Sequence, residues 1–345
     1  MKTKVLCNMT SLSFMITNKC NLNCSFCSRN AKKENELFMQ PEFIKEQIVE
    51  TLEWAPLKTI NLSGGEPFMH PQIEEILALI REYDLEIRIN TNGLLLNEKV
   101  LKMIDKYNVK MFTVSLDSAV PEVHDEIRGM KGAFEKTVKN ISKLVERGCK
   151  VFVKATVTKE NVDSILDLMK FVENIGVYGF SYSRTIPIGR ATGLKDDNDD
   201  FINKYMQMGK ETSEYSKNSR LEFLIDDPLR HKFDVRIKEY LEANPDLTKV
   251  WGGCTAGCNF LYVLLNKDVL ACTAITKPCG NLNESTLKEI WYESKQIEEL
   301  RTRDNLKGKC AKCKNKYICG GCRAYAYATT GDILGEDGFC KQVNK

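Results

Sequence analysis

The sequence contains only three histidines among 345 residues, which leaves little material for histidine-based metal binding or for a catalytic triad. Its 50 basic and 47 acidic residues nearly cancel, so a net charge of +3 gives no field that would require nucleic acid as a partner. No run approaches the ~20 apolar residues of a membrane span, and the first residues lack the apolar core and cleavage site of a signal peptide. These absences favour a cytoplasmic protein that binds neither nucleic acid nor a membrane.

Cysteine, in contrast, is abundant, with 14 residues in the chain. Hydrophobic residues make up 43% and charged residues 28%, as in an ordinary soluble globular protein. Because the cytosol keeps thiols reduced, disulfides are a poor explanation for so many cysteines. Metal ligation is the better one, and the spacing of the cysteines decides it.

The first half of the chain alternates short apolar, β-branched runs with longer segments of helical period, which is the pattern of parallel strands joined by crossover helices. The expected strands are Ser13–Thr17, Thr59–Ser63, Glu86–Thr91, Met111–Leu116, Val151–Val157 and Gly179–Arg184. The expected helices between them are Pro41–Leu52, Pro71–Glu82, Glu98–Tyr107, Phe134–Arg147 and Val162–Ile175. Six such units predict an α/β fold, a partial (β/α)6 TIM-like barrel whose ligands bind at the carboxyl ends of the strands.

The second half of the chain has a different residue pattern. A polar, acidic loop over Ile188–Asp200 leaves the barrel, and two helical patterns follow at 200–215 and 229–243. From Trp251 onward the cysteine density rises, and so short a segment has little core of its own without metal. The predicted domains are a core at 1–190, a helical bridging region at 191–250 and a small cysteine-rich domain at 251–345.

The first cysteine group, Cys20, Cys24 and Cys27, follows the first expected strand with the spacing C-x3-C-x2-C. Three thiolates on one tight loop can ligate three irons of a cubane and leave the fourth iron open for a non-protein ligand. A zinc knuckle is the simplest alternative, but zinc sites need four ligands, which are usually supplied by two C-x2-C pairs.

This spacing, with Phe26 just before the third cysteine, resembles the radical S-adenosylmethionine (radical SAM) superfamily. The resemblance implies a 4Fe-4S cluster whose free iron chelates the amino and carboxylate groups of S-adenosylmethionine. One electron then cleaves the sulfonium to a 5'-deoxyadenosyl radical, which abstracts hydrogen from the substrate. It also implies that the cluster cysteines are catalytic, and that an electron donor such as ferredoxin or flavodoxin serves the enzyme.

A second motif, Ser63-Gly64-Gly65-Glu66-Pro67, ends the second expected strand. Glycines allow close backbone approach to a ligand, and a carboxylate can accept hydrogen bonds from an ammonium. The motif resembles the superfamily's site for the methionine amino group, although Gly-Gly alone is also common in plain turns. The residues to which the resemblance assigns S-adenosylmethionine binding are Phe26, Gly64, Gly65, Glu66, Pro67, Asn92, Ser115 and Arg128. The turn Pro187-Ile-Gly189-Arg190 resembles a turn of the same family, and a purely structural role is open for it.

The C-terminal cysteines resemble the SPASM domain, an extension that carries two auxiliary 4Fe-4S clusters. The resemblance implies two ligand sets, Cys254, Cys258, Cys272 and Cys322 for one cluster and Cys310, Cys313, Cys319 and Cys340 for the other. The chain departs from the family in having two residues between Cys319 and Cys322 and in having Lys267 in place of a glycine. Cys279 is the alternative to Cys258 as a ligand. If neither binds, one auxiliary iron is open. The simplest alternative to two auxiliary clusters is a pair of structural zinc ions. Cys7 and Cys149 are expected outside every cluster, as small buried hydrophobes or as hydrogen-atom donors.

The substrate is the least determined point, because one fold hosts many reactions. The resemblance favours modification of a ribosomally made peptide by thioether, carbon–carbon or epimerising chemistry. With the first cluster only twenty residues in, the sequence leaves no room ahead of it for a peptide-recognition domain, so a separate recognition protein would be needed. The alternative is side-chain processing of a tetrapyrrole in an alternative heme pathway. A hypothesis of another class is a non-enzymatic iron-sulfur electron carrier.

Overall fold

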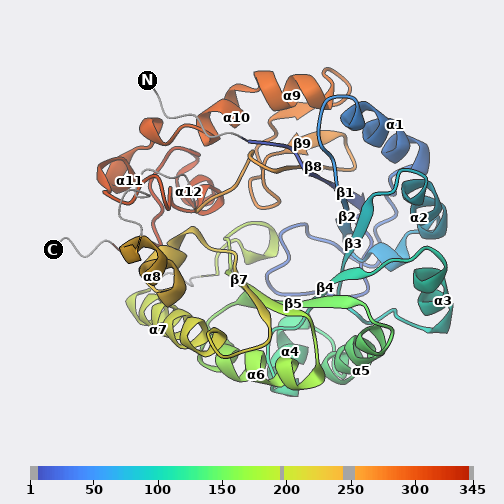
Figure 1. Ribbon diagram of the computed structural model, residues 1–345, viewed down its shortest axis with the longest axis horizontal. Helices are drawn as coiled ribbons and strands as arrows, with labels where there is room; N and C mark the ends of the chain where they lie inside the picture. The colour runs from blue at the N-terminus through green and yellow to red at the C-terminus, as the bar shows by residue number, and fades with distance from the viewer. Residues whose placement is uncertain (1–6, 195–197, 244–252, 342–345) are drawn as a thin grey trace.

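Parallel β-strands form the frame of the molecule, and they curl into a partial barrel (Figure 1). The computed structural model describes residues 7–194, 198–243 and 253–341. Its ten-stranded sheet has the order β10-β9-β8-β1-β2-β3-β4-β5-β6-β7. The strands are β1 (Ser11–Thr17), β2 (Thr59–Gly64), β3 (Glu86–Thr91), β4 (Met111–Ser115), β5 (Lys150–Val157), β6 (Gly179–Arg184), β7 (Glu222–Ile225), β8 (Phe260–Val263), β9 (Asp268–Leu270) and β10 (Gly280–Asn281). Because β1 to β6 are parallel neighbours, their carboxyl ends meet at one rim, as the predicted α/β fold requires.

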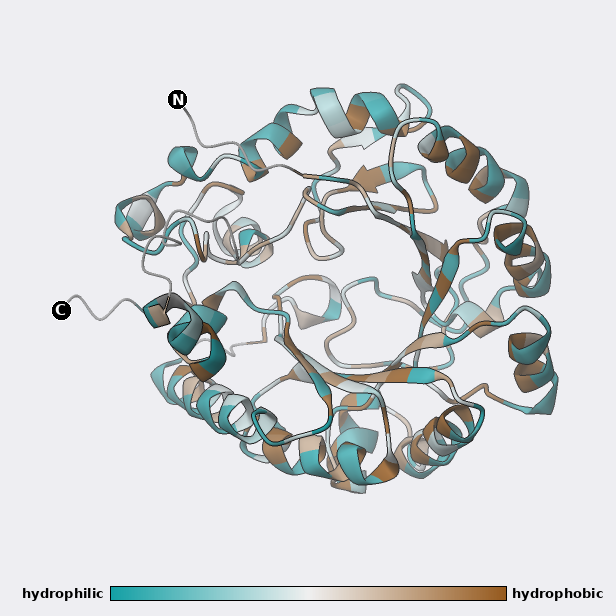
Figure 2. Ribbon diagram, viewed as in Figure 1, coloured by the Kyte–Doolittle hydropathy of each residue, from teal (hydrophilic) through white to brown (hydrophobic). Residues whose placement is uncertain are grey.

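Helices α1 to α7 cover the outer face of this sheet, and α4 lies between α5 and α6 around the barrel (Figure 1). The helices are α1 (Pro41–Leu52), α2 (Ile73–Arg81), α3 (Glu98–Lys106), α4 (Pro121–Arg128), α5 (Ala133–Glu146), α6 (Ile165–Ile175), α7 (Asp199–Ser216), α8 (Val235–Ala243), α9 (Leu287–Glu293), α10 (Lys295–Leu300), α11 (Gly308–Lys312) and α12 (Arg323–Thr330). The longer barrel helices bury a stripe of apolar residues; α6, for example, buries Ile165, Leu168, Met169 and Val172 at three- and four-residue spacing. Figure 2 shows this division, with hydrophilic colour on the outward sides of the helices.

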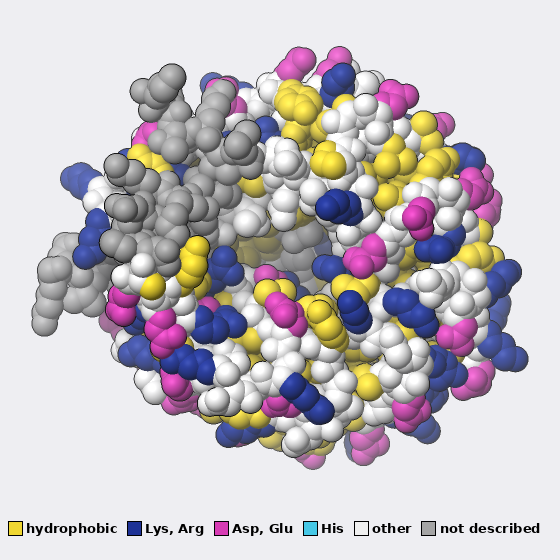
Figure 3. All heavy atoms as spheres, viewed as in Figure 1, with side chains coloured by type: hydrophobic (Ala, Val, Ile, Leu, Met, Phe, Trp, Pro, Cys, Tyr) yellow, Lys and Arg dark blue, Asp and Glu magenta, His cyan; other side chains and the backbone are white. Residues whose placement is uncertain are grey.

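The core lies between the helices and the outward face of the sheet, and the inward face is more polar. Along β5 every second residue is buried beneath the helices, and the alternate residues, such as Lys154 and Thr156, face the barrel lumen half-buried. In β4 the residues of the same face are Thr113 and Ser115. Figure 3 shows charged side chains gathered around the hollow at the middle of this view. The lumen is therefore suited to a polar or charged ligand.

The C-terminal part of the chain joins the same sheet. Strand β8 pairs in parallel with β1, from Ser11 opposite Phe260 to Phe14 opposite Val263, and β7 pairs in parallel with β6. All six expected strands are present with ends shifted by at most two residues, whereas the sequence missed β7, helix α4 and the β8–β1 pairing. The domain boundaries at 190 and 250 stay predictions, and the sheet continues across both of them.

Two further expectations are corrected in the region that follows the barrel. The helix expected over 229–243 is two pieces, a 3-10 turn at Pro228–Lys232 and α8, because the Asp227 carboxylate caps the Leu229 amide at 2.8 Å and starts the turn early. The loop expected over 188–200 contains a 3-10 turn at Gly189–Ala191, and α7 begins within it; residues 195–197 lie outside the described part. Within the described ranges, a membrane-crossing helix would need a longer apolar stretch than any helix offers.

Candidate active site

The three cysteines of the first group lie on one loop directly after β1. Cys20 and Cys24 are buried, and Cys27 is half-buried. The loop turns back on itself because the Cys27 amide donates to the Cys24 carbonyl at 3.3 Å. Burial raises the pKa of Cys20 to about 12 and also raises the pKa of Cys24. Such thiols give up their protons when a metal supplies the compensating positive charge, so the loop fits a metal cluster.

A cavity of about 250 Å³ opens beside this loop, at the carboxyl ends of the strands. Its lining joins the cysteine loop to the ends of β2, β3 and β4, as expected for a parallel α/β sheet. The predicted S-adenosylmethionine contacts found in the lining are Phe26, Gly64, Gly65, Asn92, Ser115 and Arg128. Sequence reasoning missed Arg29, which also lines the cavity. Glu66 and Pro67 stand outside the lining, so their direct contact with a ligand stays a prediction.

Glu66 braces the ends of β2 and β3 from behind the cavity. Its carboxylate is fully buried and accepts hydrogen bonds from the Thr91 hydroxyl at 2.8 Å, the Asn92 amide at 2.8 Å and the Phe68 amide at 3.3 Å. Burial raises the pKa of Glu66 to about 7, although these three donors act to lower it. Both oxygens are already bonded within the protein, so in the structure Glu66 shapes the cavity wall.

The two glycines before Glu66 allow the cysteine loop to pack against the end of β2. The Gly65 amide donates to the Thr17 carbonyl at 2.7 Å, and Gly64 has a φ of 143°. A Cβ atom at Gly64 would overlap the Thr17 carbonyl, and one at Gly65 would overlap the Lys19 carbonyl. The Gly-Gly pair is therefore required by the contact between the two loops that form the cavity.

Arg128 places a permanent positive charge on the cavity wall beside Cys24. Its Nε donates to Asp117 Oδ2 at 2.6 Å, its Nη1 lies 3.7 Å from Cys24 Sγ, and its guanidinium lies 5.2 Å from the centre of the Phe26 ring. Burial acts to lower the pKa of Arg128, but Asp117 and Cys24 raise it overall. The charge that results suits the carboxylate end of a bound ligand.

Arg190, in the turn after β6, holds the cysteine loop in place through hydrogen bonds to its carbonyl groups. Its Nε donates to the Cys24 carbonyl at 2.7 Å, its Nη1 donates to the Ala31 carbonyl at 2.9 Å, and its amide donates to the Cys27 carbonyl at 3.0 Å. The turn after β6 thus has a positioning role toward the cluster loop. The Gly-Arg pair in the sequence was the signal for it.

The first predicted auxiliary set gathers around Cys254. The Gly257 amide donates to the Ala271 carbonyl at 3.0 Å, which brings the turn that carries Cys258 against Cys272. Burial is the largest cause that raises the pKa of Cys272, and Cys254 is the next. Burial also raises the pKa of Cys322 to about 12, and Cys254 contributes there too. Cys254 is therefore close enough to Cys272 and Cys322 to raise the pKa of both thiols.

The contacts of Cys258 and Cys279 favour Cys258 as the fourth ligand of the first predicted auxiliary set. A hydrogen bond with Cys7 and burial raise the pKa of Cys258, and Cys254 adds to this shift. The Cys279 thiol instead donates to the Val269 carbonyl at 3.0 Å, on β9. Cys7, which the sequence placed outside every cluster, lies in contact with Cys258.

We expect the double variant C7A/C258A to contain fewer than about twelve irons after anaerobic reconstitution, and C279A to contain the full number. Removing Cys7 together with Cys258 takes away the nearest substitute thiol. Iron analysis with Mössbauer spectroscopy measures both variants. Loss of iron from C279A with a full count in C7A/C258A would reverse the assignment.

The second predicted auxiliary set faces a single cavity. Cys310, Cys313, Cys319 and Cys340 all line it, together with Lys232 and other basic residues. Burial raises the pKa of Cys340, while Lys232 acts to lower it. Four thiols around one space are the donor set of a closed cubane. Across the described ranges, no three His, Cys, Asp or Glu side chains lie close enough together to share a single metal ion.

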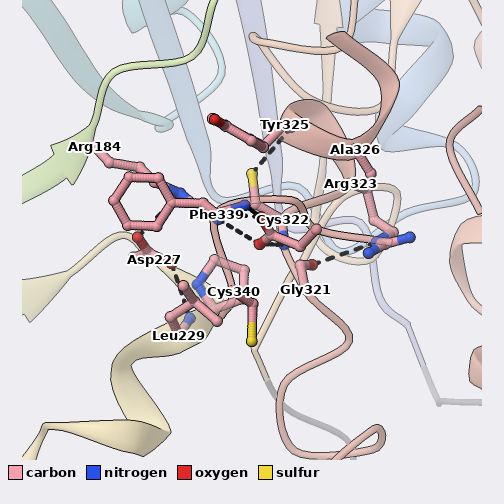
Figure 4. Close-up of polar contacts among 12 residues, drawn as sticks. Arg184, Asp227, Leu229, Gly321, Cys322, Arg323, Tyr325, Ala326, Phe339 and Cys340 are labelled. Carbon is pink, nitrogen blue, oxygen red and sulfur yellow. Dashed lines mark hydrogen bonds and ion pairs between the residues drawn. The ribbon is translucent and has the colours of Figure 1, made fainter. Parts of the chain in front are cut away.

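A buried ion network ties this region to the barrel (Figure 4). Arg184, at the end of β6, donates from Nη2 to Asp337 Oδ2 at 2.5 Å and forms an ion pair through Nε with Asp227 at 3.2 Å. The same Asp337 oxygen accepts the Cys322 amide at 2.8 Å. The guanidinium also lies 4.5 Å from the centre of the Phe339 ring. Arg184 thus connects the end of β6, through Asp337, to the backbone of Cys322, a predicted cluster ligand.

Comparison with known proteins agrees with this site. The model of the radical SAM superfamily matches residues 14–172, and that of the SPASM iron-sulfur cluster-binding domain matches residues 254–314. The AdoMet-dependent heme synthase of Methanosarcina barkeri is 29% identical over 95% of each chain, and that of Nitratidesulfovibrio vulgaris is 28% identical over 95% of this chain and 91% of its own. The subtilosin biosynthesis protein AlbA of Bacillus subtilis is 27% identical over 90% of this chain but 66% of its own. SuiB of Streptococcus suis, solved with S-adenosylmethionine, has a TM-score of 0.76 at 20% identity, covering 98% of this chain and 78% of its own.

The fold and the site define an iron-sulfur enzyme built on a partial α/β barrel. The chain belongs to the radical SAM superfamily, in its SPASM subfamily, and it is an enzyme that uses 4Fe-4S clusters and S-adenosylmethionine. When bound, these cofactors supply reductive cleavage and hydrogen-atom abstraction. The protein positions them and the substrate.

Proposed function

We propose that this enzyme processes a side chain of a tetrapyrrole in a heme-forming pathway. The observation that carries the proposal is the near end-to-end match with two AdoMet-dependent heme synthases. The match with AlbA, in contrast, leaves about a third of that protein unaligned. The comparisons therefore support the tetrapyrrole alternative better than the peptide substrate that the sequence favoured.

The lumen of the barrel carries charge of the sign that suits such a substrate. Lys154 stands opposite Ser115 in the β4–β5 register, so its side chain lies on the same face of the sheet as a residue that lines the cavity. Burial acts to lower the pKa of Lys154, but Asp226, whose Oδ2 lies 2.5 Å from its Nζ, raises it overall. Arg29 adds a second cation at the cavity. Carboxylates such as the propionate groups of a tetrapyrrole can pair with these cations.

We infer that the reaction is an oxidative decarboxylation. This reaction class would use the cations to bind a carboxylate and the predicted auxiliary cysteine sets to accept an electron. A propionate side chain that becomes a vinyl group loses one hydrogen atom, carbon dioxide and one electron. The hydrogen atom goes to the adenosyl fragment of S-adenosylmethionine, and the electron needs an acceptor. The two predicted auxiliary ligand sets offer acceptors of the one-electron kind.

Anaerobic incubation of the reconstituted enzyme with S-adenosylmethionine, dithionite and an iron porphyrin that carries propionates tests the proposal. We expect 5'-deoxyadenosine to form, and the porphyrin to lose carbon dioxide, as measured by mass spectrometry. The methyl ester of the same porphyrin is the matched control, and it should remain unchanged because it has no free carboxylate. An unchanged free-acid porphyrin together with a modified precursor peptide would overturn the proposal in favour of peptide modification and a separate recognition protein.

The cytoplasmic location and the ferredoxin or flavodoxin electron donor belong to the same proposal. Both follow from the sequence and from the need of radical SAM chemistry for a low-potential electron.

A further inference from the structure

A second hollow lies on the outer side of the cysteine loop. Its volume is about 410 Å³, and it opens to solvent because Asn23, Lys32 and Lys33 are exposed. The residues that line this outer hollow are Cys20, Asn21, Leu22, Asn23, Lys32, Lys33, Glu34 and Gly129. It shares no lining residue with the predicted auxiliary sets.

The wall between the outer hollow and the inner cavity is one residue thick at two positions. Cys20 and Leu22 line both spaces. Cys20 is also a predicted ligand of the catalytic cluster, and its backbone is fixed there by the bond from its amide to the Lys32 carbonyl at 3.0 Å. A protein that filled the outer hollow would therefore be separated from the cluster by a single cysteine.

The charge of the outer hollow is positive. Lys32 and Lys33 are exposed on its rim, and in the described part of the chain neither side chain forms an ion pair. Lys131, two residues beyond Gly129, is exposed as well, and Glu34 is the acidic residue in the lining. A surface of this sign attracts an acidic partner and speeds its association.

We propose that the outer hollow is the docking surface for an acidic, low-potential one-electron carrier protein, an inference that rests on the electron donor included in the proposed function. The electron crosses the wall at Cys20 and enters the catalytic cluster directly. The carrier loses one electron and the cluster held by Cys20, Cys24 and Cys27 gains it, with no proton or atom transferred.

A second basic surface lies beside the second predicted auxiliary set, around Cys310 and Cys313. Its lysines are largely balanced by acids, whereas those of the outer hollow are not. The ion pairs there are Lys307–Asp332 at 2.6 Å, Lys309–Glu336 at 3.5 Å and Lys316–Asp304 at 3.2 Å. Lys312 and Lys314 remain exposed. They provide a control of equal charge next to a different cluster.

The test compares K32E/K33E with K312E/K314E, using a reduced, acidic two-cluster bacterial ferredoxin as the probe. We expect K32E/K33E to weaken ferredoxin binding, measured by calorimetry at low salt, by at least about tenfold, and to slow cluster reduction in stopped-flow by a similar factor. K312E/K314E should change both by less than about twofold. With dithionite, a small reductant that needs no docking, both variants should form 5'-deoxyadenosine at the rate of the unmodified protein.

Three outcomes would overturn the proposal. The first is unchanged ferredoxin binding and reduction in K32E/K33E. The second is a larger loss in K312E/K314E, which would place electron entry at the auxiliary end. The third is an equal loss with dithionite and ferredoxin in K32E/K33E, which would mean that the lysines act on the cluster site itself. The calorimetric measurement reports ferredoxin binding to the outer hollow independently of enzyme turnover.

Discussion

Replacement of Cys24 by alanine is expected to abolish 5'-deoxyadenosine formation and to lower the iron content from about twelve to about eight atoms per chain. Cys24 is buried on the loop after β1, and its carbonyl and thiol are both held by arginines. Without this thiolate the loop has two ligands, which are too few to hold a cubane with one open iron. Iron analysis and product chromatography under anaerobic conditions measure the two effects together.

The matched control for this prediction is C149A. Cys149 is also buried, but its thiol lies 3.8 Å from the Val109 carbonyl, beside the helix-covered core and away from the cavity. We expect C149A to keep its iron and its activity, and to lose only a little stability through the small space that is left. Normal product formation in C24A would remove Cys24 from the catalytic cluster.

Replacement of Arg184 by methionine is expected to cost about 3 to 5 kcal/mol of stability, the usual range for breaking a buried ion pair on one side. The change leaves Asp227 and Asp337 buried without their cation, and the side chains of both are fully inaccessible to solvent. Because Asp337 also holds the Cys322 amide, we expect iron to be lost from the first auxiliary set. Thermal unfolding of the anaerobic protein and its iron content measure the outcome.

The pH dependence of this loss has a definite sign. Burial already raises the pKa of Asp227, against the lowering effect of Arg184, so removal of Arg184 raises that pKa further. A carboxyl group whose folded pKa lies above its unfolded value holds a proton in the folded state that it has lost in the unfolded state. Stability therefore falls as the pH rises from the unfolded pKa, about 4, toward the raised folded one, so R184M should be less stable above that range than at its acidic end.

Two variants check the cause. R147M removes a surface arginine whose Nε lies 3.6 Å from Asp105, and it should cost less than about 1 kcal/mol. The triple variant R184M/D227N/D337N removes the uncompensated charges and should recover much of the loss. A cost for R184M as small as that for R147M would contradict the network drawn in Figure 4.

The barrel could be predicted from the sequence because its strands and helices differ in period and are separated by clear turns. The β5 run, with apolar residues at every second position, and the α6 run, at every third or fourth, are unambiguous. Strand β7 has four residues and β8 has four, and neither is long enough to show a period. Their places depend on pairing with β6 and β1, which are distant in the sequence.

The cysteine loop and the Gly64-Gly65 turn could be predicted because their spacing is local. Other parts of the site depend on long-range contacts. Asp117 is an ordinary turn residue in the sequence, and its role becomes visible only where it meets Arg128. Glu66 stays a predicted ligand contact, and the three internal hydrogen bonds that its carboxylate accepts are a bracing role that no spacing pattern encodes.

The pairing of β8 with β1 bears on how the chain folds as it is synthesised. Strand β1 leaves the ribosome early, yet one of its two edges has no partner until Phe260–Val263 has been made. For most of translation this apolar strand therefore presents an open edge, which invites pairing with other chains. The barrel reaches its final form only when the cysteine-rich end has arrived, so folding and cluster assembly are coupled in time, and an early stop in synthesis leaves a species prone to aggregate.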